Sequence, residues 1–134
     1  MSTPAIQAIG LTKHFRGEGG ETVTAVDGID LTIGSGEIVA FLGPNGAGKT
    51  TTIRLLLGFL HATSGRATVM GLDIAHDSVA IRRQVGYLPG GVSFWDGLTG
   101  ERLLDELAAM SGRPPVRRAE LLDRAFRLAA GAKH

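Results

Sequence analysis

The first third of the chain consists of short apolar stretches separated by glycine-rich turns. Residues 5–12 alternate loosely between apolar and polar side chains, which predicts a first strand. Residues 17–21 are all glycine or glutamate, and this composition is typical of a tight turn. In residues 22–33, two apolar runs lie on either side of Asp27-Gly28, a strong hairpin signal. The pattern therefore predicts a small antiparallel sheet near the N-terminus.

Hydrophobic residues become nearly continuous in residues 37–42, just after a Gly-Ser-Gly turn. Such a run is typical of a strand that is covered on both faces, as in a parallel sheet. A glycine-rich loop follows at once, and residues 49–59 then place apolar side chains near helical spacing. Further along, the pattern predicts a strand at 67–70, a helix at 78–84 and a strand at 85–88. Together these elements indicate an α/β fold.

The last third of the chain has helical periodicity. Thr99 is the expected N-cap of a helix over residues 101–111, and Gly112 is expected to end it. The apolar face of this helix carries Leu103, Leu107 and Met110. A Pro-Pro pair follows, and residues 116–130 then predict a second amphipathic helix with one buried side.

Composition narrows the classes of function. The chain has 134 residues, of which 43% are hydrophobic and 20% charged, which suits one soluble domain with its own core. It has no cysteine, which excludes disulfide scaffolds, zinc–thiolate sites and thiol catalysis. The formal net charge of +1 gives no electrostatic basis for a nucleic-acid partner. We find no bilayer-spanning run and no secretion signal, so we expect a cytoplasmic location without direct membrane insertion.

The glycine-rich loop carries the clearest chemical signal. Residues 43–50 match the pattern G-x-x-x-x-G-K-[ST], and a chance match in such a chain is of order one in a few hundred. Gly43, Gly46 and Gly48 let successive backbone N–H groups turn inward around a phosphate. The helix that follows adds its unpaired amides and the positive end of its dipole. An ordinary turn is the competing interpretation, but a turn alone does not require Lys followed by Thr.

Three side chains at the end of the loop have expected roles. Lys49 supplies a cation for the outer phosphates, and the Thr50 hydroxyl is placed to bind Mg²⁺. Thr51 is placed to donate a hydrogen bond to the inner phosphate. The expected ligand is a nucleoside triphosphate with Mg²⁺, and ATP is the favoured one.

The loop and its neighbours resemble the ATP-binding subunit of an ABC transporter. Residues 43–51 closely resemble the Walker A motif of that family. Further segments resemble its first strand, its leading hairpin, the stretch after its first helix and the region around its Q-loop; they are residues 11–15, 25–31, 63–67, 71–74, 85–89 and 98–104. The resemblance covers nearly the whole chain and is closest to bacterial drug and antibiotic exporters.

The resemblance implies an incomplete P-loop NTPase core. It divides the chain into an antiparallel β subdomain at 1–36, part of the P-loop core at 37–90 and the start of a helical subdomain at 91–134. It also implies that Lys49 and Thr50 are catalytic and that Thr50 binds Mg²⁺. The residues implied for nucleotide binding are Phe15, Gly43, Pro44, Asn45, Gly46, Ala47, Gly48, Lys49, Thr50 and Thr51.

Two positions outside the loop also bear on the resemblance. Phe15 corresponds to the aromatic residue that stacks on adenine, and its flat apolar face suits a base. Its alternative interpretation is an ordinary core phenylalanine. Gly90 stands where the family usually has Gln or, in some exporters, Glu, near magnesium and the transporter interface. Glycine offers no side-chain ligand at that position.

The resemblance further implies that ATP hydrolysis is coupled to export of a small molecule. The implied partners are a second ATPase subunit and transmembrane permease subunits, which would hold the chain at the inner face of the cell membrane. Strands later in the family's sequence flank the segment that corresponds to residues 37–42, so an open apolar edge is expected there.

The catalytic outcome depends on segments beyond the loop. These 134 residues contain no Leu-Ser-Gly-Gly signature, Walker B strand or switch histidine, so we expect this chain alone to bind ATP with little or no hydrolysis. One alternative is a non-catalytic nucleotide-binding or interaction fragment. Another P-loop enzyme, such as a GTPase or small-molecule kinase, is disfavoured because no Asn-Lys-x-Asp guanine signature is present.

Overall fold

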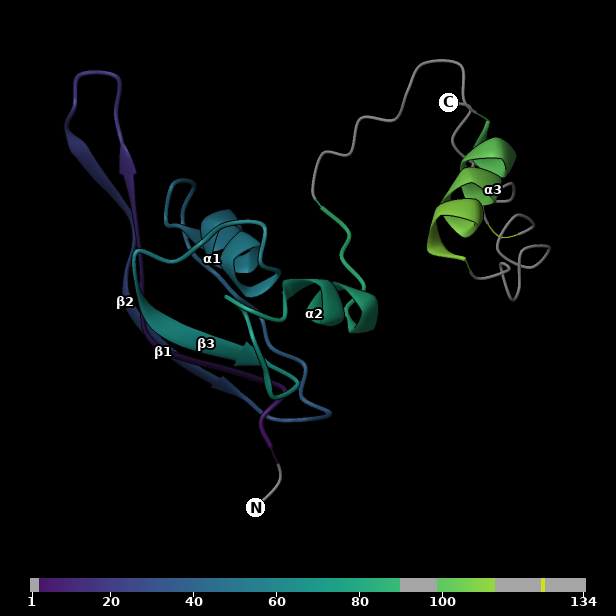
Figure 1. Cartoon of the computed structure of the whole chain (residues 1–134), viewed down its shortest axis with the longest axis horizontal. Coiled ribbons are helices and arrows are strands. Elements are labelled where there is room, and N and C mark those ends of the chain that lie inside the picture. Colours follow the sequence, from purple (N-terminus) through teal and green to yellow (C-terminus); the bar gives the residue numbers. More distant parts are fainter. Residues whose placement is uncertain (1–2, 90–98, 113–123, 125–134) are drawn as a thin grey trace. The chain divides into compact units, whose positions relative to one another are not determined.

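The computed structural model describes residues 3–89, 99–112 and 124 (Figure 1). It divides into two units, Met1–Tyr87 and Leu88–His134. In chain order the elements are β1 (Ile6–Arg16), β2 (Thr22–Ile33), α1 (Lys49–Leu56), β3 (Ser64–Val69), β4 (Leu72–Asp73), α2 (Ser78–Gln84) and α3 (Gly100–Ser111). The first unit contains all of these elements except α3, and the glycine-rich loop lies within it.

The first unit is built on an antiparallel sheet with strand order β2-β1-β3-β4. The turn between β1 and β2 is closed by the Gly17 amide, which donates to the Glu21 carbonyl at 2.9 Å. A turn at residues 17–21 and an antiparallel sheet near the N-terminus are therefore confirmed. Figure 1 shows the β1–β2 hairpin extending beyond the rest of the sheet.

The predicted hairpin turn at Asp27-Gly28 is wrong, because β2 continues through it. β1 extends to Arg16 and therefore pairs with β2 on both sides of Gly28. Gly28 instead adopts a φ of 56°, and its amide donates to the Thr12 hydroxyl at 3.0 Å. Asp27-Gly28 thus lies at a local irregularity in the pairing of two long strands, not in a turn.

The core lies between the sheet and the helices α1 and α2. Leu11 from β1, Leu55 from α1 and Ile81 from α2 are fully buried in it. Ala8 of β1 is buried beside them, and the first strand predicted at residues 5–12 is confirmed, although it extends to Arg16. The helix α2 has the predicted bounds, whereas α1 ends at Leu56 instead of residue 59. Gly58 follows with a φ of 66°, a left-handed conformation that does not continue an α-helix.

The predicted strands at 37–42 and 85–88 do not form among the described residues. Both segments lack a hydrogen-bonded partner strand there, and a strand exists only where a neighbour receives its backbone groups. In the first segment, Val39 and Phe41 line an apolar cavity against α1 and are 49% and 40% exposed, whereas Ile38 and Leu42 are almost fully exposed. The segment thus keeps the alternation of a strand without the sheet around it.

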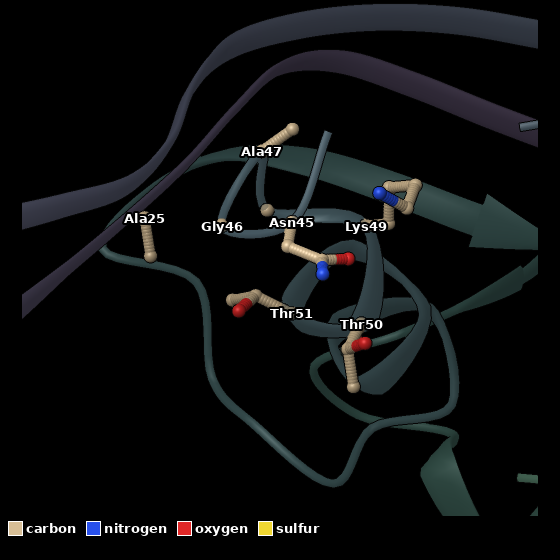
Figure 2. Close-up of a pocket in the computed structure, with 8 residues that line it drawn as sticks. Ala25, Asn45, Gly46, Ala47, Lys49, Thr50 and Thr51 are labelled. Atoms are coloured by element: carbon tan, nitrogen blue, oxygen red, sulfur yellow. The ribbon is translucent and has the colours of Figure 1, made fainter. Parts of the chain in front are cut away.

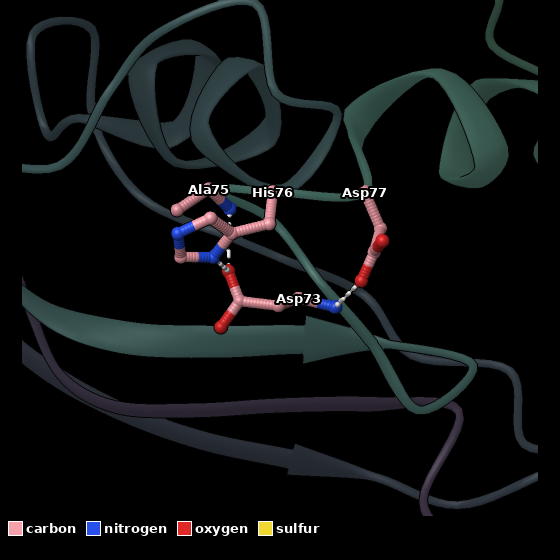
Figure 3. A network of polar contacts seen from close by, with 4 residues as sticks. All are labelled: Asp73, Ala75, His76 and Asp77. Atoms are coloured by element: carbon pink, nitrogen blue, oxygen red, sulfur yellow. Dashed lines mark hydrogen bonds and ion pairs between the residues drawn. The ribbon is translucent and has the colours of Figure 1, made fainter.

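A network of short contacts joins β4 to α2 (Figure 3). The Ala75 amide donates to the Asp73 carboxylate at 2.6 Å, and the Asp73 amide donates to the Asp77 carboxylate at 3.1 Å. The His76 ring lies 3.3 Å from the same Asp73 oxygen that Ala75 contacts. The Ala75 hydrogen bond is the main cause that lowers the pKa of Asp73. The preceding strand, predicted at residues 67–70, is β3; it begins three residues earlier, at Ser64, and ends one residue earlier, at Val69.

The second unit is described only through its helix α3 and its flanks. The Thr99 hydroxyl accepts a hydrogen bond from the Arg102 amide at 3.3 Å, and Gly112 ends the helix with a φ of 64°. Both predicted caps are therefore confirmed. The predicted helix at 116–130 and the Gly90 position lie outside the described residues. Among the described helices, none has the length and apolar character needed to cross a membrane.

Candidate functional site

The glycine-rich loop surrounds a cavity of about 240 Å³ at the start of α1 (Figure 2). The residues that line this loop cavity are Ala25, Asn45, Gly46, Ala47, Gly48, Lys49, Thr50 and Thr51. Seven of them belong to the predicted nucleotide-binding set, so the structure brings most of that set together around one hollow. Gly43 and Pro44 also belong to the predicted set but are not among the lining residues; their carbonyls accept hydrogen bonds from Lys49.

Glycine is required at the end of the loop for two physical reasons. Gly48 has a φ of 84°, in the left-handed region that other residues avoid. A Cβ atom on Gly48 would also lie only 2.2 Å from the carbonyl oxygen of Ala25. Gly48 therefore lets the loop backbone approach β2, whereas Gly46, with a φ of 86°, has open space where a Cβ would be.

The first turn of α1 presents unpaired amides at the loop cavity. The first amide bound within the helix is that of Thr52, which donates to the Gly48 carbonyl at 2.8 Å. Helix geometry leaves the amides of Lys49, Thr50 and Thr51 without an acceptor inside the helix. No acidic residue lies in the first turn, so nothing there offsets the positive end of the helix dipole. Such an end favours an anion.

Thr52 stabilises this arrangement from the buried side of α1. Its side chain is 1% exposed, and its hydroxyl donates to the Gly48 carbonyl at 3.0 Å. The Gly48 carbonyl thus receives both the amide and the hydroxyl of one residue. Since Thr52 is fixed in the core, the last loop residue and the first helical turn are held together.

Lys49 is the one charged residue among those that line the loop cavity. Its ammonium group donates to the carbonyl of Gly43 and, at 2.6 Å, to the carbonyl of Pro44. These contacts fold the lysine across the base of the loop. The ammonium group is thus paired with two loop carbonyls, and Lys49 contributes a positive charge to the residues that line the loop cavity.

The residues of the loop cavity could hold Mg²⁺ only together with the phosphates of a ligand. Among the described residues, no group of three or more His, Asp or Glu side chains could hold a metal ion. The Thr50 hydroxyl lines the loop cavity and is exposed. Mg²⁺ usually keeps several waters and binds through few protein ligands together with substrate phosphates. The donor set thus fits an ion shared by phosphate oxygens and Thr50, not an all-protein cage.

Phe15 lies outside the group of residues that line the loop cavity. It stands on β1 opposite Val23 of β2, with 39% of its surface exposed, so it is not a core residue. The Lys13 ammonium lies 5.0 Å from the centre of its ring, within the range of a cation–π contact. The pair Phe15 and Val23 is therefore an exposed apolar patch on the hairpin.

Ala25 is the lining residue that sequence reasoning missed. It belongs to β2, more than fifteen residues before the loop, and reaches the loop cavity through its approach to Gly48. The requirement for glycine at residue 48 was a usable signal that another backbone lies close. The sequence did not identify Ala25 as that neighbour, because its position depends on the register of a distant strand.

The chain is a P-loop α/β protein. This class is defined by the glycine-rich loop, the helix that follows it and the α/β arrangement. The family model described as ABC transporter matches residues 26–132, well over half of the sequence. The chain belongs to the ABC transporter family. The resemblance and the incomplete P-loop NTPase fold stated from the sequence are thereby confirmed.

Individual relatives agree with the family. The chain is 38% identical over 125 residues to the daunorubicin/doxorubicin resistance ATP-binding protein DrrA of Streptomyces peucetius, covering 90% of this chain and 36% of the relative. It is 40% identical over 114 residues to ABC transporter A family member 9 of Dictyostelium discoideum, covering 85% of this chain and 13% of that protein. A solved ATP-binding subunit of an ABC transporter superposes with a TM-score of 0.73 at 28% identity, covering 96% of this chain and 52% of that one. The chain thus spans only part of each.

Proposed function

We propose that this chain binds Mg²⁺-ATP through the loop cavity, as the nucleotide-binding part of an ABC transporter ATPase that exports a small molecule. The observation that carries the proposal is the first turn of α1, where three free amides and Lys49 meet around a hollow without an acidic residue. Similarity to an ATP-binding protein named for daunorubicin and doxorubicin resistance supports the export of a drug-like molecule.

Each loop residue has a role in this proposal. The amides of Lys49, Thr50 and Thr51 donate to phosphate oxygens, and the Lys49 ammonium leaves the Pro44 carbonyl for the outer phosphates. The Thr50 hydroxyl and the phosphates share the Mg²⁺ ion, which neutralises charge on the phosphates when bound. The exposed ring of Phe15 offers a face on which adenine stacks.

In this proposal the chain works as one subunit of a larger transporter complex. A second ATPase subunit and transmembrane permease subunits complete the transporter, and through the permease the chain lies at the cytoplasmic face of the cell membrane. The similarity to a solved ATP-binding subunit supports a separate nucleotide-binding subunit. Nucleic acid has no place in this proposal.

We further propose that the 134-residue polypeptide binds ATP without steady turnover. Phosphoryl transfer needs a group that orients the attacking water and further charge stabilisation, in addition to a phosphate cradle. The loop supplies the cradle, one lysine and one hydroxyl ligand for the metal. The second candidate function, a non-catalytic nucleotide-binding or interaction module, is favoured by Gly90, which provides no side chain at the Q-loop position.

Calorimetry with Mg²⁺-ATP and Mg²⁺-GTP tests the proposal, with Lys49→Ala as the control. We expect binding of ATP, weaker binding of GTP, and a loss of about 10- to 100-fold in affinity for the variant, the size of a lost charged hydrogen bond. Equal ATP affinity of the wild-type chain and Lys49→Ala would contradict the proposal that ATP binds at the loop cavity. Phosphate release above that of Lys49→Ala would contradict the absence of turnover. Turnover gained on adding a polypeptide with the signature and Walker B strand would favour the ATPase over the non-catalytic module.

A further inference from the structure

A second cavity, of about 360 Å³, lies at the edge of the sheet where the chain leaves β4. Three segments line this edge cavity: residues 60–62 after α1, residues 65–67 of β3, and residues 73–76 at the end of β4. None of these described residues borders the loop cavity. The volume lies within the usual range of roughly 300–1,000 Å³ for small-molecule sites, so the edge cavity has room for a ligand of its own.

The edge cavity has apolar lining residues that belong to the core. Ala67 of β3 and Ile74 after β4 are buried, and the Ile74 amide donates to the Ala67 carbonyl at 3.2 Å. Leu60 and Ala62 are half-buried and pack against the same core. An apolar group bound here exchanges water for side chains that are already packed, which is favourable.

Asp73 supplies the edge cavity with a negative charge and a free acceptor. The Ala75 amide and the His76 ring both contact Oδ1 of Asp73, at 2.6 and 3.3 Å. Oδ2 has no partner among the described residues, and Figure 3 shows it pointing away from Ala75 and His76. The Ala75 hydrogen bond is the main cause that lowers the pKa of Asp73, so the side chain is a carboxylate at neutral pH.

Arg66 supplies the opposite charge from the neighbouring strand. Asp73 is paired with Thr68, and Arg66 lies two residues before Thr68, so Arg66 and Asp73 are diagonal neighbours on one face of the sheet. Such neighbours are separated by about 7–8 Å, within reach of one ligand between two long side chains. The Arg66 guanidinium forms no hydrogen bond or ion pair with a described residue, Asp73 included. The edge cavity is therefore lined by two opposite charges that do not neutralise each other.

We propose that the edge cavity binds a zwitterion with an apolar body, namely an α-amino acid with an aliphatic side chain. The Arg66 guanidinium donates to the carboxylate of the amino acid, a pairing for which its planar fork is suited. The ammonium group of the amino acid donates to Oδ2 of Asp73, and the aliphatic side chain lies against Ala67 and Ile74. A simple anion leaves Asp73 unpaired, and a simple amine leaves Arg66 unpaired. This site is separate from the proposed nucleotide site and does not depend on it.

The test titrates the 134-residue chain with L-leucine, with isocaproate, which lacks the ammonium group, and with isoamylamine, which lacks the carboxylate. Amide NMR spectra report both the affinity and the place of binding. We expect leucine to shift the amides of Arg66, Ala67 and Ala75 but not those of Thr50 and Thr51, which line the loop cavity. We expect each analogue to bind at least about fivefold more weakly than leucine, because each lacks one charged hydrogen bond.

Two variants assign the charges. Arg66→Gln is expected to bind leucine no better than isoamylamine, and Asp73→Asn to bind it no better than isocaproate. Arg83→Gln removes an exposed arginine of α2 outside the edge cavity and is expected to keep the preference for leucine. The same preference in Arg66→Gln or Asp73→Asn as in the unaltered chain contradicts the assigned contacts.

The unaltered chain decides the inference even where a variant fails to fold. Equal affinities for the three compounds overturn it, as do shifts confined to the loop cavity. The absence of shifts at about 10 mM leucine also overturns it, since that concentration saturates a site of millimolar affinity or better. A chain that binds leucine at the edge cavity but does not bind ATP contradicts the proposed function and leaves this inference in place.

Discussion

The paired sheet and the unpaired segment at 37–42 have similar apolar sequences but different structures. β1 contacts a partner on each side, and its residues Ala8 and Leu11 are buried. The segment at 37–42 is as apolar, yet no described residue pairs with its backbone, and Ile38 and Leu42 are almost fully exposed. An apolar run is thus necessary for a buried strand but does not produce one, because the backbone groups need a neighbour.

The loop joins these two parts, and it depends on the paired one. Gly48 contacts the Ala25 backbone of β2, and the Thr52 hydroxyl holds the Gly48 carbonyl from within the core. In the segment at 37–42, Val39 and Phe41 line an apolar cavity together with Ile53 and Leu56 of α1. The geometry of the loop is therefore set by β2 and α1, although the strand-like segment lies next to it in sequence.

The largest expected difference between the two parts is in stability. Leu55→Ala removes a fully buried side chain between α1 and the sheet, so we expect a loss of about 2–5 kcal/mol in the free energy of unfolding. Leu42→Ala removes the same atoms at a position that is 87% exposed, and we expect a change within about 0.5 kcal/mol. Urea unfolding followed by circular dichroism measures both. Similar losses for the two variants would show that residues 37–42 are packed as firmly as α1.

A smaller effect is expected where the loop contacts β2. Gly48→Ala combines a left-handed φ with the clash against the Ala25 carbonyl, whereas Gly46→Ala has a similar φ and no neighbour within 4 Å. The conformational penalty shared by both is about 1–2 kcal/mol. We expect Gly48→Ala to bind Mg²⁺-ATP at least about tenfold more weakly than Gly46→Ala, by calorimetry. Equal affinities would mean that the loop does not need its contact with β2.

Features with local causes were predictable from the sequence, and features with distant partners were not. The turn at 17–21, the bounds of α2, the Thr99 cap and the glycine-rich loop each follow from a few neighbouring residues. The supposed turn at Asp27-Gly28 failed because β1 supplied a long partner for β2. Ala25 was missed for the same reason, since a bulge in a distant strand places it at the loop cavity.

The smallest expected effect tests a polar network inside the paired part. The pKa of Asp73 is lowered from 3.8, chiefly by the hydrogen bond from the Ala75 amide and further by His76. A carboxylate whose pKa is lower in the folded state stabilises the fold above its unfolded pKa, and this contribution is lost as the pH falls through the folded pKa. Asp73→Asn keeps an acceptor for Ala75 but removes the charge.

We therefore expect the wild-type chain to be more stable than Asp73→Asn at pH 5–7, and the difference to shrink as the pH falls below about 4. Because the Asp73 side chain is 43% exposed, solvent screening limits the difference to less than about 1 kcal/mol. Urea unfolding of both proteins across this pH range measures it, with the exposed Asp27→Asn as a matched control. A difference that grows on acidification would reverse the sign and show that the network favours the protonated carboxyl. A pH-independent difference would attribute the loss to hydrogen-bond geometry instead of charge.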